Sequence, residues 1–362
     1  MTPPPVPRAD AVRALAARWL PRLGDGDFVV SPAGLWLALG AVAAGARGRT
    51  AEELRGLLGV AGEEAAGAVT VAGRRLAATG GLAVGTGVWA RVPVREEYRR
   101  GLPGVRFGEL RGDAQAVLDA WVREATGGRI DGLPLGLDGS EALVLLNALA
   151  LKASWRTAFP AHLTRDEPFT DGRGAVRPVP TMRRRVPAAW AWRVGGATVV
   201  ELPCAGEDAA LVRFVLGAEG AGPAGTLPAA WAAPGGREGF AADAVDLSLP
   251  RFTLRTRTGV DAHLAALGVV RALRPGADFA GLTPDPAGLF VDEVVQEAVV
   301  EVAEEGVEAA AVTAVRMARS ASAPRREAVE RIAFDRPFGV VVLDATGEVP
   351  LFAGWRSGTG PS

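Results

Sequence analysis

The order of the periodic segments along the chain constrains the fold most, because helical patterns dominate the first third and strand patterns dominate the rest. Apolar residues recur at helical spacing from Asp10 to Leu20, and Leu35 to Ala44 continues as an apolar helix. From Ala142–Ala150 onward, apolar and alternating runs are typical of strands. Helices separated from strands, with no internal repeat and no linker, predict an α+β fold in one large domain.

Several shorter segments have recognisable boundaries. Ser31-Pro32 is predicted to be a helix N-cap followed by a first-turn proline. Thr50-Ala-Glu-Glu is predicted to be a capping box for a helix through Leu58. Val260–Leu267 is predicted to be a short helix, and the Gly/Ala/Pro-rich stretch from Gly217 to Gly239 a surface insertion or long loop.

Charge and composition exclude some classes of partner. The chain has 362 residues with 40 Lys+Arg against 41 Asp+Glu, a formal charge of −1. Such a balance implies neither a nucleic-acid partner nor an anionic membrane. Hydrophobic residues make up 49% and charged residues 22% of the chain. This composition supports a large buried core and argues against disorder.

The residues that enzymes most need are scarce. Cys204 is the single cysteine, which excludes a disulfide framework and a cysteine-based zinc cluster, and His162 and His263 are the two histidines. No G-x-S-x-G motif occurs, and Gly354-Trp-Arg-Ser-Gly358 has the wrong spacing. We therefore predict no catalytic residue, no metal and no cofactor, and a hydrolase is the weakest alternative function.

Two stretches bear on localisation. Met1 to Ala11 is proline-rich and has no apolar run, which predicts no secretory signal and a cytoplasmic chain. Phe28 to Ala46 is the longest uncharged stretch and is long enough for a membrane span. Because Ser31-Pro32 interrupts it near its start, a strand, a turn and a buried helix are favoured instead, and we expect no membrane contact.

A long Val- and Glu-rich strand, predicted from Phe290 to Val302, leads to an unusual segment. After Glu304-Glu305-Gly306, the residues from Val307 to Met317 follow a period of two. Both charges fall on one face, and the opposite face is small or apolar apart from Thr313. The segment is therefore able to lie in a sheet with one side buried.

The same segment has a second interpretation, and its surroundings are distinctive. Its run of alanines has high helix propensity, so an amphipathic helix remains an alternative. The following residues, Ser320 to Arg326, are small, polar and Pro-containing, which is typical of an exposed, cleavable loop. A strand-capable segment joined to an exposed loop suggests a segment with two possible places in the fold.

This part of the chain resembles a known family. Val294 to Thr313 is similar to the hinge of the serpins, the serine protease inhibitor family, and the resemblance continues in order over roughly Ala11 to Trp355. It is carried by Phe28-Val-Val-Ser-Pro-Ala-Gly-Leu-Trp36, Asn147-Ala-Leu-Ala-Leu-Lys-Ala-Ser-Trp155, Thr164-Arg-Asp-Glu-Pro-Phe169, Val179-Pro-Thr-Met182, Leu249-Pro-Arg-Phe252, Leu267-Gly268 and Phe334-Asp-Arg-Pro-Phe338.

The resemblance, to an inhibitory member of prokaryotic type, implies a fold. It implies a serpin-like single domain with three β-sheets, about eight or nine helices and an exposed reactive loop. The domain would span 11–356, with the reactive loop at about 306–326, between an N-terminal tail at 1–10 and a C-terminal tail at 357–362.

The resemblance also implies a mechanism. A serine protease cleaves the loop of a metastable inhibitor and forms an acyl-enzyme. The freed loop inserts as a new strand in the main sheet, drags the protease across the molecule and stalls deacylation. The inhibitor would be a suicide substrate, a monomer before it meets the protease. By family resemblance an extracellular location is open beside the cytoplasmic one.

The hinge residues fit the inhibitory form. Insertion needs small residues because the sheet must open and close quickly compared with deacylation. A charge or a proline at Val307, Ala309 or Ala311 would favour a non-inhibitory member, and none is present. A serpin-fold binding or chaperone protein that does not inhibit is the alternative function. The predicted hinge comprises Glu304, Glu305, Gly306, Val307, Glu308, Ala309, Ala310 and Ala311.

The cleaved bond has two main candidates. The family's usual spacing from the hinge glycine leads to Ser320-Ala321. One residue earlier is Arg319-Ser320, which we prefer because an exposed arginine fits the acidic specificity pocket of a trypsin-like protease. Arg325 and Arg326 are outside candidates.

Four further positions are assigned supporting roles by the resemblance. Ser31 and Asn147 would lie under the region where the main sheet opens, and Trp155 where the loop first enters. The family often has histidine at the position of Gln296, in a network beneath the sheet. Glutamine can hydrogen-bond there but cannot become charged, so no pH-triggered behaviour is expected through this position.

Overall fold

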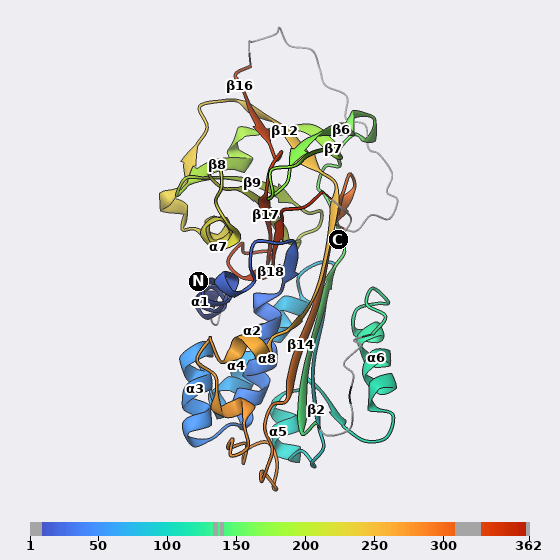
Figure 1. The fold of residues 1–362 in the computed structure, drawn as a ribbon, viewed down its shortest axis with the longest axis vertical. Helices are drawn as coiled ribbons and strands as arrows, with labels where there is room; N and C mark the ends of the chain where they lie inside the picture. Colours follow the sequence, from blue (N-terminus) through green and yellow to red (C-terminus); the bar gives the residue numbers. More distant parts are fainter. Residues whose placement is uncertain (1–8, 133–136, 138–140, 308–326, 360–362) are drawn as a thin grey trace.

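The computed structural model describes residues 9–132, 137, 141–307 and 327–359. Most helices surround one half of an elongated molecule, and strands run from that half to the other end (Figure 1). The helices are α1 (Ala9–Trp19), α2 (Pro32–Gly45), α3 (Gly48–Leu58), α4 (Glu63–Ala77), α5 (Glu96–Gly101), α6 (Ala114–Ala125), α7 (Pro223–Thr226) and α8 (Asp261–Leu264). Short 3-10 turns are η1 (Leu20–Arg22), η2 (Ala161–Leu163), η3 (Ala188–Trp190), η4 (Leu227–Trp231), η5 (Pro234–Gly236) and η6 (Arg271–Leu273).

The first of three sheets, here called the main sheet, follows the long axis of the molecule (Figure 1). Its strand order is β3-β2-β4-β14-β15-β5, and β13 pairs with β14 on the other side. Its strands are β2 (Leu82–Ala90), β3 (Arg106–Glu109), β4 (Leu143–Leu151), β5 (Ala153–Ser154), β13 (Phe252–Gly259), β14 (Glu293–Ala303) and β15 (Gly306–Val307).

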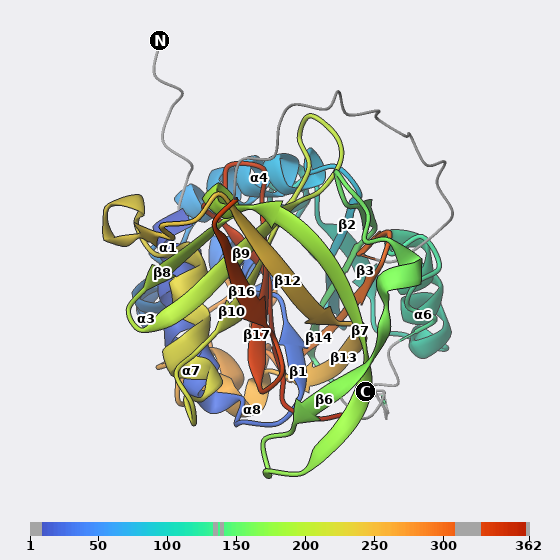
Figure 2. The same cartoon turned by 90° about the horizontal axis from the view of Figure 1, so that it is seen from above.

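The other two sheets cover the end of the molecule away from most helices. One has the order β1-β18-β17-β10-β9-β8-β11, and the other, here called the top sheet, has the order β16-β12-β7-β6 (Figure 2). Their strands are β1 (Phe28–Val30), β6 (Arg165–Thr170), β7 (Val176–Pro187), β8 (Ala191–Val194), β9 (Ala197–Pro203), β10 (Leu211–Leu216), β11 (Glu238–Gly239), β12 (Ala244–Pro250), β16 (Val329–Ala333), β17 (Phe338–Leu343) and β18 (Pro350–Arg356).

Helix α2 forms the centre of the core, and every one of its residues is buried. An all-apolar helix of this length is buried on every side, as expected for the core of a large domain. The Ser31 hydroxyl accepts a hydrogen bond from the Gly34 amide at 3.0 Å, and Pro32 occupies the first turn, so the predicted strand, turn and buried helix are confirmed. No helix in the described ranges combines the length and apolarity needed to cross a bilayer.

The predicted capping box is wrong. Helix α3 begins at Gly48, and its N-cap residue, Arg47, makes no side-chain cap. The Thr50 hydroxyl instead accepts from the Asp278 amide at 2.9 Å, and the Glu53 carboxylate accepts from the Val270 and Arg271 amides at 2.9 and 2.7 Å. Tertiary contacts with the segment 270–278 use the side chains that would otherwise cap the helix.

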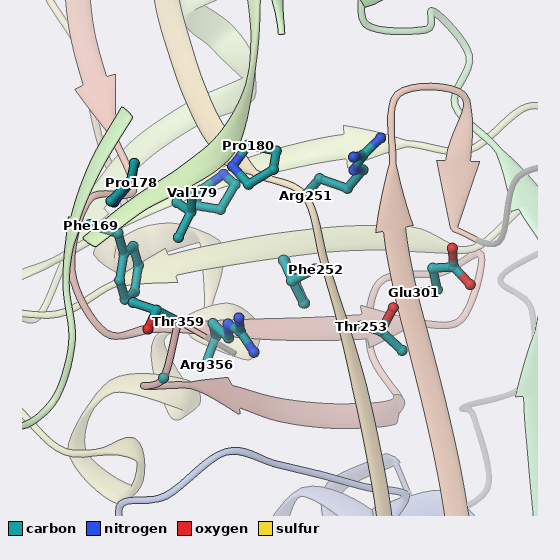
Figure 3. A pocket seen from close by; sticks show the side chains of 12 residues that line it. Phe169, Pro178, Val179, Pro180, Arg251, Phe252, Thr253, Glu301, Arg356 and Thr359 are labelled. Carbon is teal, nitrogen blue, oxygen red and sulfur yellow. The ribbon is translucent and has the colours of Figure 1, made fainter. Parts of the chain in front are cut away.

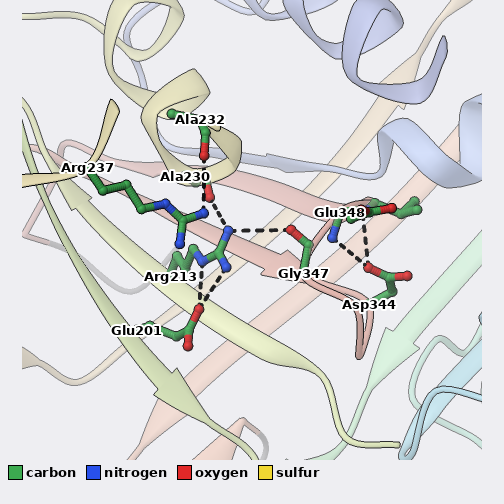
Figure 4. Close-up of polar contacts among 9 residues, drawn as sticks. Glu201, Arg213, Ala230, Ala232, Arg237, Asp344, Gly347 and Glu348 are labelled. Carbon is green, nitrogen blue, oxygen red and sulfur yellow. Dashed lines mark hydrogen bonds and ion pairs between the residues drawn. The ribbon is translucent and has the colours of Figure 1, made fainter. Parts of the chain in front are cut away.

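The segment from Gly217 to Gly239, predicted to be a surface insertion or long loop, lies largely at the surface but is not a structureless loop. The segment holds α7 and η4, and Leu227 is fully buried. Arg213 of β10, only 4% exposed, donates to the Ala230 carbonyl oxygen at 2.5 Å and to Glu201 at 2.8 Å (Figure 4). A buried guanidinium needs such partners, and here they attach the segment to the sheet. Helix α8 is shorter than predicted and covers Asp261–Leu264.

Candidate functional site

The predicted hinge turns back from β14 and enters the main sheet as β15. Gly306 and Val307 pair with Ala303 and Val302 of β14 on one side. On the other side they pair antiparallel with Ser154 and Ala153 of β5. The side chain of Val307 is fully buried. The strand interpretation is therefore confirmed at Val307, which lies between two strands of the main sheet.

Gly306 is required by the close approach of β5. A Cβ atom at this position would lie 2.2 Å from the Ala153 carbonyl oxygen and 2.7 Å from the Ser154 Cα. Because both atoms belong to backbone, they cannot move aside as a flexible side chain could. The hinge glycine thus allows the chain to enter the sheet at this point.

Trp155 secures the turn between β14 and β15. Its indole Nε1 donates to the Ala303 carbonyl oxygen at 2.9 Å, and its amide donates to the Glu305 carbonyl oxygen at 2.8 Å. Its ring packs edge-on against Phe214, with centroids 6.3 Å apart. A buried indole with a satisfied N–H is a rigid anchor. The predicted residue Trp155 therefore lies where the chain enters the sheet.

Glu304 is also tied to the segment that follows β5. Its backbone carbonyl oxygen accepts from the Phe159 amide at 2.7 Å, and its carboxylate accepts from the Thr164 hydroxyl at 2.9 Å. The Arg251 guanidinium lies 3.7 Å from the same carboxylate. Together with Trp155, these contacts hold the turn in one position.

Beyond β15 the main sheet is closed. Strands β4 and β14 pair in parallel, from Val144 opposite Glu293 to Ala150 opposite Val299. At the far end the Asp292 carboxylate accepts from the Ala142 and Leu143 amides at 2.5 and 3.1 Å. A further strand could enter between them only if this ladder separated.

Three predicted residues form one buried network beneath the closed ladder. Gln296 of β14 accepts from the Ser31 amide at 2.6 Å and donates to the Ser31 carbonyl oxygen at 2.9 Å. Its amide nitrogen also lies 3.4 Å from the Asn147 side-chain oxygen of β4. Asn147 donates in turn to the Gly85 carbonyl oxygen and the Thr86 hydroxyl, both at 3.2 Å. The network therefore spans β14, β4 and β2 and reaches the start of α2.

The network depends on the absence of a side chain at Gly34. A Cβ there would lie 1.8 Å from the Asn147 side-chain oxygen. We expect Gly34→Ala to lower the free energy of unfolding by about 3 kcal/mol, because Asn147 must leave its buried partners. Gly67→Ala in α4 is the matched control: nothing lies within 4 Å of its added Cβ, and it should gain about 0.5–1 kcal/mol. Urea unfolding measures both changes, and equal effects would contradict the role of Gly34.

The remaining predicted site residues lie outside the described residues. They are Glu308, Ala309, Ala310 and Ala311 of the hinge, and Arg319, Ser320 and Ala321 at the predicted cleavage site.

The cysteine and the histidine that a hydrolase could use have surroundings that favour a structural role over catalysis. Burial raises the pKa of the Cys204 thiol to about 12, so the nucleophilic thiolate is disfavoured. His263 accepts a hydrogen bond at Nδ1 from the Trp19 indole at 3.0 Å. No three His, Cys, Asp or Glu side chains in the described ranges gather as metal ligands.

A cavity of about 300 Å³ beside β13 and β14 is lined by residues such as Phe169, Phe252 and Arg356, without a cysteine or a histidine (Figure 3).

Comparison with known families identifies the fold. The family model described as "Serpin (serine protease inhibitor)" matches residues 10–357. The chain belongs to the serpin family. Its three sheets, single domain and eight α-helical segments in the described ranges, two of them single turns, confirm the predicted fold class.

Relatives match most of this serpin. Serpin-Z2A of Oryza sativa subsp. japonica is 31% identical over 94% of this chain and 95% of its own length. The leukocyte elastase inhibitor of Bos taurus is 30% identical over 72% of this chain and 70% of its own. The solved structure of Serpin48 from the insect Tenebrio molitor has a TM-score of 0.81 at 26% identity, covering 97% of this chain and 98% of that one.

The fold alone is also shared with a protein that is named for a different role. Thyroxine-binding globulin, solved with thyroxine, has a TM-score of 0.80 at 21% identity and covers 97% of this chain and 98% of its own. A fold does not decide function by itself. The activity of this serpin therefore has to be argued from its hinge and main sheet.

Proposed function

We propose that this serpin inhibits a serine protease as a suicide substrate. The protease serine Oγ attacks the carbonyl carbon of the cleaved residue, and the residue after the bond leaves as an amine that takes up a proton. The ester so formed links protease and inhibitor. The freed loop then inserts between β4 and β14 and carries the ester away from the geometry that water needs to hydrolyse it.

The register of the described strands supports insertion. β15 already pairs with β14 on one edge and β5 on the other. Continued residue by residue, both pairings would bring Ala310 opposite Ala150 and Val299, and these two residues are paired with each other in the closed sheet. The two ladders therefore converge on one register, and residues 308–316 would replace the parallel β4–β14 pairing without a slip.

The side chains of the segment match that register, which is the observation that carries the proposal. Its one polar residue on the core face, Thr313, would come opposite Asn147 and Gln296, the polar residues of the buried network. Ala309 would come opposite Leu151 and Val300, which are 3% and 1% exposed. The small Ala309 would therefore lie at a tightly packed position, and the Thr313 hydroxyl would lie beside the side-chain amides of Asn147 and Gln296.

The charges on the other face are compatible with this register. Glu308 would come opposite Lys152 on one side and Glu301 on the other, and both of these residues are exposed. Arg316 would come opposite Glu293, whose Oε2 is buried and has no hydrogen-bond partner among the residues that the structure describes. Burial, reinforced by Asp261 and Glu141, raises the pKa of the Glu293 carboxyl in the native fold. An arginine opposite would favour the charged carboxylate, so insertion would relieve an unfavourable site.

Arg319-Ser320 is the proposed reactive bond, and a trypsin-like protease the proposed target. Arg319→Glu should slow trypsin inhibition by about a hundredfold or more, because a glutamate cannot enter an acidic specificity pocket. Arg325→Glu is the matched control and should leave inhibition unchanged. The measurement is the rate of trypsin inactivation, with an SDS-resistant adduct on gels and mass spectrometry of the released C-terminal peptide.

The outcomes separate the alternatives. A released peptide that begins at Ser320 supports the proposed bond, and one that begins at Ala321 moves it to Ser320-Ala321. Loss of inhibition in the Arg325 variant alone would place the reactive bond at Arg325 instead. If the unaltered protein is only nicked by trypsin-, chymotrypsin- and subtilisin-like enzymes and forms no adduct, the inhibitory proposal is wrong and a non-inhibitory serpin remains.

A further inference from the structure

The top sheet carries a basic hollow of about 770 Å³ on its outer face. Its lining includes Arg183, Arg184 and Arg185 in sequence on β7, with Arg165 of β6 and Arg331 of β16, and a single acidic residue, Asp246. The register brings Arg185 and Arg331 to opposite sides of Asp246. Five arginines thus meet in one concave surface, although the chain as a whole is nearly neutral.

The arginines of the hollow are only partly neutralised. The Glu167 carboxylate is shared by Arg165 and Arg183. Arg184 has no carboxylate partner within the described ranges, and its guanidinium lies 5.4 Å from the ring centroid of Phe159. Arg331 is exposed and makes no ion pair with any residue that the structure describes. Positive charge therefore remains available in this concave, partly desolvated surface, where a partner could bind it.

The hollow adjoins the chain that emerges from the reactive loop. Glu327 is the first described residue after the loop, and its carboxylate pairs with Arg185 at 3.0 Å. Two residues later the chain enters β16, which carries Arg331. A protease engaged on the loop would therefore meet the top sheet, which caps this end of the molecule (Figure 2).

We infer that the basic hollow receives an acidic surface segment of the target protease and speeds the encounter. This inference rests on the proposed function. Charge complementarity at such a secondary contact raises association rates through electrostatic steering. Arginine forks and an exposed apolar residue beside them are typical of protein interfaces, and Leu163 lines the hollow at 43% exposure.

The pattern of charges favours a protein over a polyanion chain. Glu167, Asp246 and Glu327 lie between the arginines and hold Arg165, Arg183 and Arg185 in place. A sulfated or phosphorylated polymer binds best to an uninterrupted row of cations, since it carries charge along its whole length. A protein segment with one or two carboxylates can instead meet Arg331 and avoid the acidic residues.

The test compares two trypsins that share one specificity pocket but differ in surface charge, an anionic and a cationic trypsin. The unaltered serpin should be inactivated into adduct faster with the anionic enzyme at low salt. Arg331→Glu should reduce that rate by about tenfold and flatten its dependence on ionic strength, with little change for the cationic enzyme. Arg331→Ala should give a smaller loss in the same direction.

Arg49→Glu is the matched control, because Arg49 is an exposed arginine of α3, at the opposite end of the molecule (Figure 1). It should leave both rates unchanged, and melting curves should show all variants folded. If adduct forms at the same rate with the Arg331 variants, the inference is wrong although the proposed function stands. The same holds if Arg331→Glu abolishes retention on a heparin column and changes neither trypsin rate. If the unaltered protein forms no adduct at all, both fall.

Discussion

Cleavage within the loop is expected to raise the melting temperature of this serpin by about 10 °C or more. Insertion of residues 308–316 would replace one parallel ladder with two antiparallel ladders. Each additional net hydrogen bond contributes about 1 kcal/mol, and the buried alanines, Thr313 and Val315 add apolar burial. A gain of about 10 kcal/mol corresponds to a shift of about 13 °C for a domain of this size.

The measurement uses protein nicked in the loop by catalytic amounts of a metalloprotease, which forms no acyl-enzyme and is therefore not trapped, followed by circular dichroism at rising temperature. The intact chain under the same conditions is the reference. A synthetic peptide of residues 308–319, added to intact protein, should raise the melting temperature in the same direction, because it can occupy the same gap without cleavage. An unchanged melting temperature after nicking would show that no strand is added, and the trapping mechanism would fail with it.

Moving one glutamate by a single residue is expected to turn the inhibitor into a substrate. In the double variant Glu308→Ala with Ala309→Glu, the composition of the hinge is unchanged, but the carboxylate moves from the exposed face to the core face. There it would meet Leu151 and Val300, both buried. Burying an unpaired carboxylate costs several kcal/mol, and about 3 kcal/mol on the insertion step slows it by about a hundredfold.

The outcome is measured as the number of inhibitor molecules consumed per trypsin inactivated. The double variant should be cleaved at the normal rate but yield almost no SDS-resistant adduct, and nicking it should leave its melting temperature nearly unchanged. Glu308→Ala alone is the control and should inhibit normally, since its position faces the exposed residues Glu301 and Lys152. Equal adduct from both variants would contradict the derived register.

Local sequence patterns predicted the parts of the fold in which every side chain has the same, apolar environment. The buried helix α2 follows from an uninterrupted apolar run with a Ser-Pro start, because a helix that is apolar on every side has to be buried. Patterns failed where polar side chains are used at long range. Thr50 and Glu53 bind the segment 270–278 rather than their own helix, and Arg213 attaches a Gly/Ala/Pro-rich segment that has no periodic signal of its own.

For the candidate site, too, local patterns predicted one part and long-range contacts decided the other. Alternation and residue size alone predicted that the segment from Val307 onward is able to form a strand with one small apolar face, because side-chain direction in a strand has a period of two. Which strands it would join was decided only by the tertiary structure. Ser31 and Gln296 are hydrogen-bonded to each other although they are 265 residues apart in the chain. Strand β15 lies between β14 and β5. Pairing between distant segments depends on the packing of the whole core, and no local pattern records it.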